Sequence, residues 1–195
     1  MRRFLIVSHK AKGNGDFSLD DLPGAGRMDI LAISSSSALF LSHSLRKDVE
    51  VWILFSDSVL LRIIGSEAKY LFPDERNMAA AIRNALIRNK AGKKMLPGIY
   101  IDSMDLESAL KTAAEDSAIY YLKEDGKDAY EVEFHQNSTF VLGDHMDLTE
   151  EEESLVKKFD AKTISLGKNS LHTYQAIVIV HHILDRRDEN AEVSP

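Results

Sequence analysis

Two short segments near the C-terminus constrain the fold of this chain most strongly. Residues 139–145 and 163–172 each begin with β-branched and apolar residues typical of a strand, stop at a glycine and continue into sequence that favours a helix. Glycine lets the backbone bend sharply there, or approach a ligand where a Cβ would collide. The two turns, at Gly143 and Gly167, should place two loops at the carboxyl ends of strands. In an α/β sheet, that edge is where ligands usually bind.

The rest of the chain alternates between short apolar runs and segments with a helical spacing of apolar residues. The apolar runs predict strands over residues 4–8, 48–55, 58–64, 99–101, 117–122, 138–142 and 162–166. The helical segments cover residues 29–45, 73–88, 105–114, 149–158 and 172–184. A turn is expected at residues 124–126, and the second and third strands should form a hairpin in a mixed sheet. We therefore expect one α/β domain over residues 1–195, with a mostly parallel sheet and helices on both faces.

Three features of this pattern affect the search for a site. Residues 10–27 form a loop long enough to be functional or mobile. The last helix is apolar on most sides, which predicts burial in the core or at a subunit interface, and the charged residues 185–195 after it should be a frayed tail. The glutamates at 150–153 begin a helix with a capping box from Thr149 to Glu152, so we expect them to stabilise that helix rather than to act catalytically.

Composition narrows the classes of function. With 195 residues, 44% of them hydrophobic, the chain can build one substantial core. It has no cysteine, so disulfides, thiolate zinc sites and cysteine nucleophiles are excluded. Its seven histidines lack the spacing of metal ligands, and we expect no metal site. The apolar runs are too short for a signal peptide or a membrane span, so we expect a soluble, cytoplasmic protein.

The formal net charge of −7 argues mildly against a nucleic-acid partner, because binding phosphates normally draws on an excess of Lys and Arg. The distribution of charge matters more than the sum, however. Local basic groups occur in the first half of the chain: Arg2/Arg3, Lys10/Lys12, Arg46/Lys47, Arg83/Arg88/Lys90 and Lys93/Lys94. A basic face on an acidic protein is therefore compatible with the sequence.

Standard nucleotide-binding fingerprints are absent around the two glycines. There is no G-x-G-x-x-G after a strand and no G-x-x-x-x-G-K-[ST], so a Rossmann dinucleotide site and a P-loop are both disfavoured. A single strand–glycine–helix turn is more often a structural bend than a ligand site. Here two occur in succession, both followed by polar residues, and Leu142, Leu166 and Leu171 offer an apolar rim. This combination favours a ligand site.

The segment from residue 16 to residue 29 allows two interpretations. Its Asp and Gly residues could simply form a turn that leads into a helix. It could also face a substrate, with Arg27 contacting phosphate and Asp29 handling a proton.

Three stretches of the sequence, taken together, are similar to one known family. They are residues 17–29 with 38–43 (FSLDDLPGAGRMD and ALFLSH), residues 69–76 (KYLFPDER), and residues 164–171 with 178–185 (ISLGKNSL and VIVHHILD). From about Arg3 to Asp185 the chain resembles the archaeal-type tRNA pseudouridine N1-methyltransferases of the SPOUT superfamily. The resemblance implies a homodimeric RNA methyltransferase that uses S-adenosylmethionine and has a C-terminal trefoil knot. Periodicity and spacing alone would not have suggested a knot, because chain threading is so rare.

The resemblance also implies where the cofactor binds. In such enzymes it lies in the knot loops, which here would follow Leu122, Leu142 and Leu166. The implied cofactor contacts are Leu122, Leu142, Gly143, Leu166, Gly167, Lys168, Asn169, Ser170, Leu171 and Ala176. Relatives often have a cysteine where this chain has Ala176, a departure expected to tune packing, because the methyl transfer needs no thiol.

The same resemblance gives candidate roles to residues that would meet the RNA. Pseudouridine has a free N1–H that uridine lacks, so the enzyme must help this nitrogen lose its proton, and Asp29 is the candidate acceptor. Candidate contacts to RNA phosphates or bases are Arg27, Arg46, Arg76 and Arg83. The expected reaction is methylation of N1 of pseudouridine 54 in the tRNA T-loop. Two alternatives stay open: the same transfer to a ribosomal RNA pseudouridine, and a non-catalytic α/β module that binds a nucleotide-like ligand.

Overall fold

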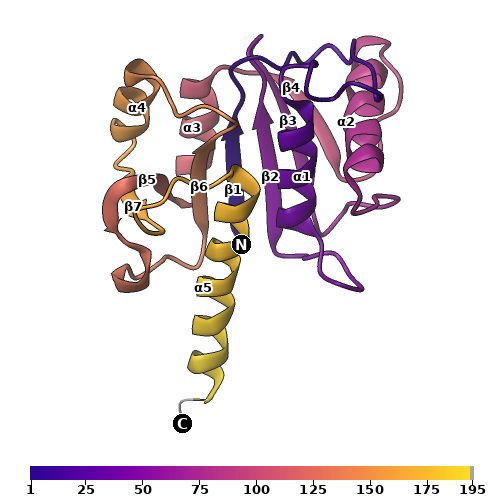
Figure 1. Ribbon diagram of the computed structural model, residues 1–195. Helices are drawn as coiled ribbons and strands as arrows, with labels where there is room; N and C mark the ends of the chain where they lie inside the picture. The colour runs from indigo at the N-terminus through magenta and orange to yellow at the C-terminus, as the bar shows by residue number, and fades with distance from the viewer. Residues whose placement is uncertain (194–195) are drawn as a thin grey trace.

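The computed structural model describes the backbone of residues 1–193 and the side chains of residues 1–189. Its strands are β1 (Arg2–Val7), β2 (Val49–Leu54), β3 (Val59–Ile64), β4 (Ile99–Ser103), β5 (Ala118–Asp128), β6 (Ser138–Gly143) and β7 (Lys162–Ser165). Its α-helices are α1 (Met28–Leu39), α2 (Glu75–Lys90), α3 (Leu106–Ala114), α4 (Glu150–Lys157) and α5 (Thr173–Val193), and a short 3-10 helix, η1, covers Ala129–Glu131. The predicted succession of strands and helices is confirmed (Figure 1).

The seven strands form one sheet in the order β4-β3-β2-β1-β6-β5-β7. β1 pairs in parallel with both β2 and β6, and β5 pairs in parallel with both β6 and β7. The pairs β2–β3 and β3–β4 are antiparallel, so the predicted hairpin is present in a mostly parallel sheet. The parallel strands bring the carboxyl ends of β1, β5, β6 and β7 to one edge of the sheet.

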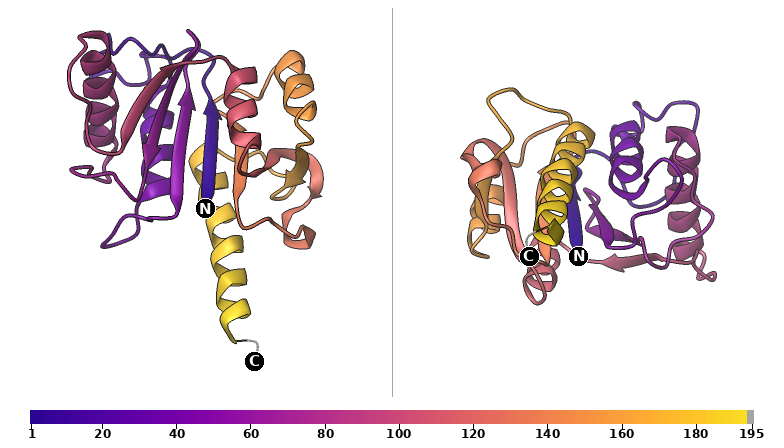
Figure 2. Two further views of the ribbon diagram at one scale, coloured as in Figure 1. Left: turned by 180° about the vertical axis from the view of Figure 1, so that it is seen from behind. Right: turned by 90° about the horizontal axis from the view of Figure 1, so that it is seen from below.

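Alternate residues of the central strand β1 point into two separate cores. Phe4 and Ile6 pack in a core with residues of α1, α2 and α5, whereas Leu5 and Val7 pack in a core with residues of α3 and α4. All four side chains are buried, as expected for a strand covered on both faces. The predicted arrangement of helices on both faces of the sheet is thus confirmed, and Figure 2 shows the two layers from behind and from below.

The first helix is shorter than predicted. α1 stops at Leu39 instead of residue 45, because Phe40 adopts an extended conformation. The chain then turns back on itself, and the amide of Leu41 donates to the carbonyl of Ser44 at 2.8 Å. The apolar residues after Leu39 had suggested a longer helix, but Leu41 is in fact 46% exposed.

The last helix is longer than predicted. α5 runs to Val193, through residues that the sequence suggested would fray. Asp185 accepts hydrogen bonds from Arg2 on β1 and from Arg46, so the charged half of α5 is anchored to the sheet instead of being free. Although α5 is long, no helix within the described residues combines the length and apolarity needed to cross a membrane.

The predicted turn at residues 124–126 lies within a strand. Leu122 and Lys127 both pair with Ile164 of β7, so the four residues between them bulge out of the ladder. β5 then continues along β7 to Asp128. The bulge forms a loop beside the carboxyl end of β7. The sequence had suggested instead that the strand over residues 117–122 ended there.

Candidate functional site

A cavity of about 410 Å³ opens between the bulge of β5 and the carboxyl ends of β6 and β7. Nine of the ten predicted cofactor contacts line it: Leu122, Leu142, Gly143, Leu166, Gly167, Asn169, Ser170, Leu171 and Ala176. The tenth, Lys168, does not line it. The sequence prediction missed a further set of lining residues: Lys123, Glu124, Asp144, His145, Met146, Asp147, His172 and Thr173. These residues adjoin the predicted ones, so their position next to the ends of parallel strands was the signal that could have found them.

Gly143 closes the end of β6 in a space that no side chain could share. A Cβ built on it would lie 2.0 Å from the carbonyl oxygen of Met146. The loop can therefore fold back against the end of the strand only because residue 143 is glycine. The hydroxyl of Thr173, at the start of α5, donates to the Gly143 carbonyl at 2.8 Å and fixes the same turn from the other side.

Ser165 joins the bulge of β5 to the loop after β7. Its hydroxyl donates to the carbonyl of Glu124 at 2.9 Å and accepts from the amide of Gly167 at 3.1 Å. Gly167 has a φ of +127°, which residues with a Cβ rarely adopt. Two walls of the cavity are thus held together by one buried serine.

Asp144, which follows β6, organises the third wall from inside the protein. Its side chain is fully buried. It accepts hydrogen bonds from the Ser8 hydroxyl (3.0 Å) and from the backbone amides of His9 (3.1 Å), His145 (2.7 Å) and Met146 (3.1 Å). Burial acts to raise the pKa of Asp144, but the hydrogen bonds from His9 and Met146 outweigh it and hold the pKa below its usual value. An ionised carboxylate therefore shapes the loop that lines the cavity.

The imidazole of His9 continues this network to α4. Its Nδ1 lies 3.3 Å from Asp144, and its Nε2 lies 2.9 Å from Glu152. Glu152 also accepts from the amide of Thr149 at 2.8 Å, as part of the predicted capping box, which is confirmed. Burial acts to lower the pKa of His9, but the two carboxylates outweigh burial and raise it. Both ring nitrogens face acceptors, which is the geometry of a protonated imidazole.

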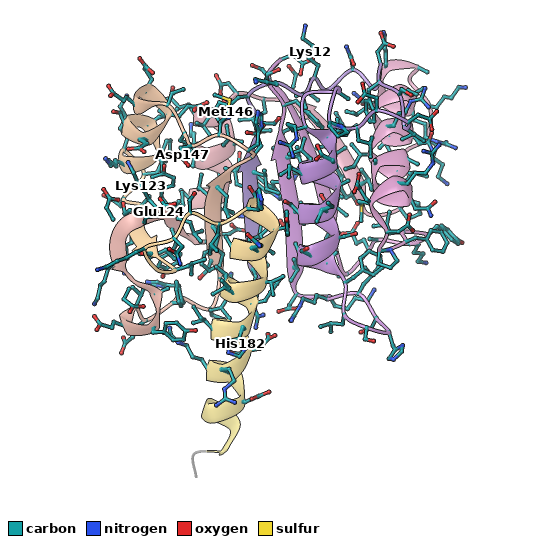
Figure 3. The ribbon with its side chains drawn as sticks, in the orientation of Figure 1. Lys12, Lys123, Glu124, Met146, Asp147 and His182 are labelled. Atoms are coloured by element: carbon teal, nitrogen blue, oxygen red, sulfur yellow. The ribbon has the colours of Figure 1, made fainter. Side chains whose placement is uncertain are left out.

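The cavity wall carries more negative than positive charge. Glu124, Asp144 and Asp147 all line it, and the lining residue Lys123 is paired with Glu153 of α4 at 2.6 Å. Figure 3 shows Lys123, Glu124 and Asp147 on the side of the molecule where α4 lies. With the apolar leucines of its rim, the cavity suits a ligand that combines a positive charge with an apolar or aromatic part.

Arg27 and Asp29 form one pair at the start of α1. The guanidinium binds the carboxylate with two hydrogen bonds, Nε to Oδ1 at 3.0 Å and Nη2 to Oδ2 at 2.9 Å. Burial acts to raise the pKa of Asp29, but Arg27 outweighs it, so the pKa lies below its usual value. The charge of Asp144 contributes to a raised pKa of Arg27, after the larger effect of its hydrogen bond to Asp29, so the pair lies within electrostatic reach of the cavity wall.

The other three predicted RNA contacts lie in different places. Arg46 binds Asp185 through both terminal nitrogens, at 3.1 and 2.6 Å, so its guanidinium has a structural partner, and its contact with RNA stays a prediction. Arg76 and Arg83 lie together on α2. Arg76 donates to the carbonyl of Leu19 at 2.9 Å, and the buried Nε of Arg83 has no partner within the described residues.

Solved structures share this fold. The chain is similar to Nep1 of Archaeoglobus fulgidus bound to S-adenosylhomocysteine, with a TM-score of 0.63 and 14% identity over 95% of this chain and 96% of that one. It is also similar to ribosomal RNA small subunit methyltransferase E of Neisseria gonorrhoeae bound to S-adenosyl methionine, with a TM-score of 0.50 and 14% identity over 95% of this chain and 66% of that one. The chain therefore has the fold of these methyltransferases.

Sequence comparison then places the chain within a family. The family model described as "Putative SAM-dependent RNA methyltransferase" matches residues 1–189. Relatives named "tRNA (pseudouridine(54)-N(1))-methyltransferase" are 44% identical in Methanosarcina mazei (99% of this chain, 95% of the relative) and 35% identical in Methanocaldococcus jannaschii (96% and 98%). The chain belongs to this family of RNA methyltransferases, as the resemblance in its sequence predicted.

Proposed function

We propose that the protein transfers a methyl group from S-adenosylmethionine to N1 of pseudouridine 54 in the T-loop of tRNA. The observation that carries this proposal is the convergence of the β5 bulge and the loops after β6 and β7 on one acidic cavity, in a chain of this family. When bound, S-adenosylmethionine supplies an electrophilic methyl group on a positively charged sulfur. The acidic and apolar residues of the cavity fit such a molecule in charge and polarity.

The cofactor contacts that we propose are the nine predicted residues that line the cavity. Leu142, Leu166 and Ala176 offer apolar surface, and Gly143 leaves the wall free of a Cβ. Among the unpredicted lining residues, the carboxylate of Asp147 is positioned to accept hydrogen bonds from a cationic or hydroxyl-bearing ligand. The role of these side chains is to hold the reacting methyl in line with the target nitrogen, at about 3–3.5 Å.

The target nitrogen must also lose its proton. We propose that Asp29 accepts this proton, directly or through a water, while Arg27 contacts a phosphate of the RNA. Arg27 keeps Asp29 ionised, which makes the carboxylate available as an acceptor, although its lowered pKa makes it a weak base. Transfer of Arg27 from Asp29 to an RNA phosphate would raise the basicity of Asp29 when the substrate is bound.

We also propose that the chain forms one SPOUT-like domain with a C-terminal trefoil knot. The support for this proposal is the membership of the chain in a family of RNA methyltransferases, together with the single seven-stranded sheet to which all strands belong. A crystal structure in which α5 could be drawn away without passing through a loop would contradict the knot.

The protein is further proposed to act as a cytoplasmic homodimer. α5 begins at the cavity, and Val178 in its first half is 52% exposed. A second copy that covers this apolar position would also lie close to the site. Light scattering over a range of concentrations tests the dimer, and a monomer at every concentration would contradict it.

Mass spectrometry of tRNA nucleosides tests the proposed reaction. The protein is incubated with labelled S-adenosylmethionine and a tRNA that carries pseudouridine at position 54, with the same tRNA carrying uridine as the control. We expect labelled N1-methylpseudouridine only in the tRNA that carries pseudouridine at position 54. Transfer to ribosomal RNA fragments but not to tRNA would support the ribosomal alternative. Binding of S-adenosylhomocysteine with no transfer to either RNA would support a non-catalytic module.

A further inference from the structure

One segment of this acidic protein carries basic residues and no acidic ones. From residue 76 to residue 101 the sequence has six basic residues and no Asp or Glu, although the net charge of the chain is −7. The six are Arg76, Arg83, Arg88, Lys90, Lys93 and Lys94. All lie on α2 or in the loop that leads from α2 to β4, and all are exposed except Arg83, which is half-buried. We refer to these six residues as the α2 surface.

The spacing of these residues arranges them in a row. Arg76, Arg83 and Lys90 are seven residues apart, so on a helix each lies about 10 Å along the axis from the previous one and on the same face. Asn77 and Asn84 form a neighbouring exposed row with amide donors. Figure 3 shows side chains with nitrogen tips projecting from the outer side of α2. A line of donors and cations is thus presented to solvent along the whole helix.

The charge of this surface is available to a partner. Within the described residues, Arg76 is the member of the α2 surface that forms an ion pair, with Asp20 at 2.9 Å, and both side chains are mostly exposed. Such exposed pairs are weak, because water screens them. Arg88 donates to the carbonyl of Lys94 at 3.1 Å, which orders the loop that carries Lys93 and Lys94 without neutralising any charge.

The α2 surface is connected to the candidate site through the loop after β1. Arg76 holds the carbonyl of Leu19 in this loop, and Gly15 lies so close to α2 that a Cβ on it would be 3.2 Å from the carbonyl oxygen of Arg83. The same loop contains His9, whose backbone amide donates to Asp144 in the cavity wall at 3.1 Å, and ends at Arg27. A polyanion that lies along α2 would therefore be led over this loop to the cavity.

We infer that the α2 surface binds the phosphate backbone of the tRNA whose base enters the cavity, an inference that rests on the proposed function. The row of guanidinium and ammonium groups complements a row of phosphates, and guanidinium groups can bind phosphate oxygens with two hydrogen bonds. Phosphate contacts of this kind position a nucleic acid without reading its sequence. The α2 surface accordingly fixes where the tRNA lies, while the cavity selects the base.

A pair of matched triple variants tests this inference. K90Q/K93Q/K94Q removes three exposed lysines of the α2 surface, and K111Q/K158Q/K162Q removes three exposed lysines elsewhere. The affinity of each variant for pseudouridine-containing tRNA is measured at several salt concentrations in the presence of S-adenosylhomocysteine. Each lost phosphate contact should reduce the slope of log K against log[salt] by about 0.7–0.9. We expect the magnitude of this slope to fall by about 2 for K90Q/K93Q/K94Q, the α2 variant, and to stay unchanged for K111Q/K158Q/K162Q, the control.

Kinetics, and binding of S-adenosylhomocysteine and of anionic phospholipid vesicles, complete the test. The α2 variant should raise the KM for tRNA at least tenfold, with little change in kcat and no change in affinity for S-adenosylhomocysteine. Equal salt slopes for both triple variants would overturn the inference. It would also be overturned if K90Q/K93Q/K94Q lost binding to anionic phospholipid vesicles but kept the wild-type affinity for tRNA. If the wild-type protein binds tRNA through the α2 surface but transfers no methyl group, the proposed function fails and the binding surface stands.

Discussion

At the scale of single residues, Gly143 is the position where one added carbon should damage the site most. A Cβ there would meet the carbonyl oxygen of Met146 at 2.0 Å, and this backbone cannot move without displacing the turn that Asp144 and Thr173 hold. We expect Gly143→Ala to weaken binding of S-adenosylhomocysteine at least tenfold, measured by calorimetry, and to destabilise the fold by about 1–3 kcal/mol.

The matched control for this change is Gly92→Ala. Gly92 has a positive φ, +62°, and a Cβ there would find no atom within 4 Å. Its replacement should cost on the order of 1 kcal/mol of stability through backbone strain and leave the affinity unchanged. If Gly143→Ala binds the ligand as well as the wild type, the turn is not part of the cofactor site.

A second residue, His181, gives the fold a dependence on pH. Its buried ring lies between the carbonyl of Ala38, 3.0 Å from Nε2, and Arg2, 3.2 Å from Nδ1. Burial, and then the charges of Arg46 and Arg2, lower its pKa to about 4. In the unfolded chain its pKa is about 6.5, so between about pH 6.5 and pH 4 only the unfolded state binds this proton. The stability should therefore fall by about 3 kcal/mol as the pH is lowered through this window.

Urea denaturation at neutral pH and at about pH 4.5 measures this effect. The variant His181→Gln keeps a donor and an acceptor but cannot be protonated. We expect it to be less stable than the wild type at neutral pH and to lose less stability on acidification. An identical loss in both proteins would show that other groups cause the acid sensitivity.

At the scale of elements, His9 connects three parts of the structure: the end of β1, the loop after β6 and the first turn of α4. His9→Phe preserves a ring but removes both side-chain hydrogen bonds, which leaves the buried Asp144 with fewer donors. We expect faster hydrogen exchange in residues 144–152 and a several-fold weaker affinity for S-adenosylhomocysteine. The exposed His43, replaced in the same way, is the control and should change neither quantity.

The charge of His9 makes a pH-dependent contribution of the opposite sign to that of His181. Since the pKa of His9 is raised in the folded protein, its contribution to stability is complete below about pH 6.5 and is lost as the pH rises through the raised value. His9→Phe should therefore reduce the loss of stability at alkaline pH. Unchanged exchange in residues 144–152 would contradict the connecting role of His9.

The sequence allowed prediction of elements whose signals are local. α4 has its capping box where Thr149 and Glu152 predicted it, and α3 begins after the capping residue Asp105. One helix end that was predicted wrongly depends on distant residues. α5 continues past residue 184 because Arg2 and Arg46, far away in the sequence, bind Asp185. No periodicity could have revealed that contact.

At the scale of the whole molecule, the position of the site was predictable but its chemical composition was not. Two strand–glycine turns indicated the carboxyl edge of the sheet, and the family resemblance added the loop after Leu122. The buried connection from Asp144 through His9 to Glu152 joins residues 143 positions apart, and nothing in the sequence indicated it. Glu124 was missed because it lies in a bulge whose position depends on how β5 pairs with β7, whereas Asp147 was missed although it closely follows the end of β6.

The position of β1 in the sheet has a consequence for the newly made chain. β1 leaves the ribosome before the other six strands of the sheet, yet one of its two neighbours, β6, begins only at Ser138. Until β6 has been synthesised, the edge of β1 that pairs with β6 has no partner strand, and the apolar side chains of β1 lack part of their final contacts. The first third of the chain must therefore stay only partly ordered, or be shielded from other chains, until β6 is synthesised.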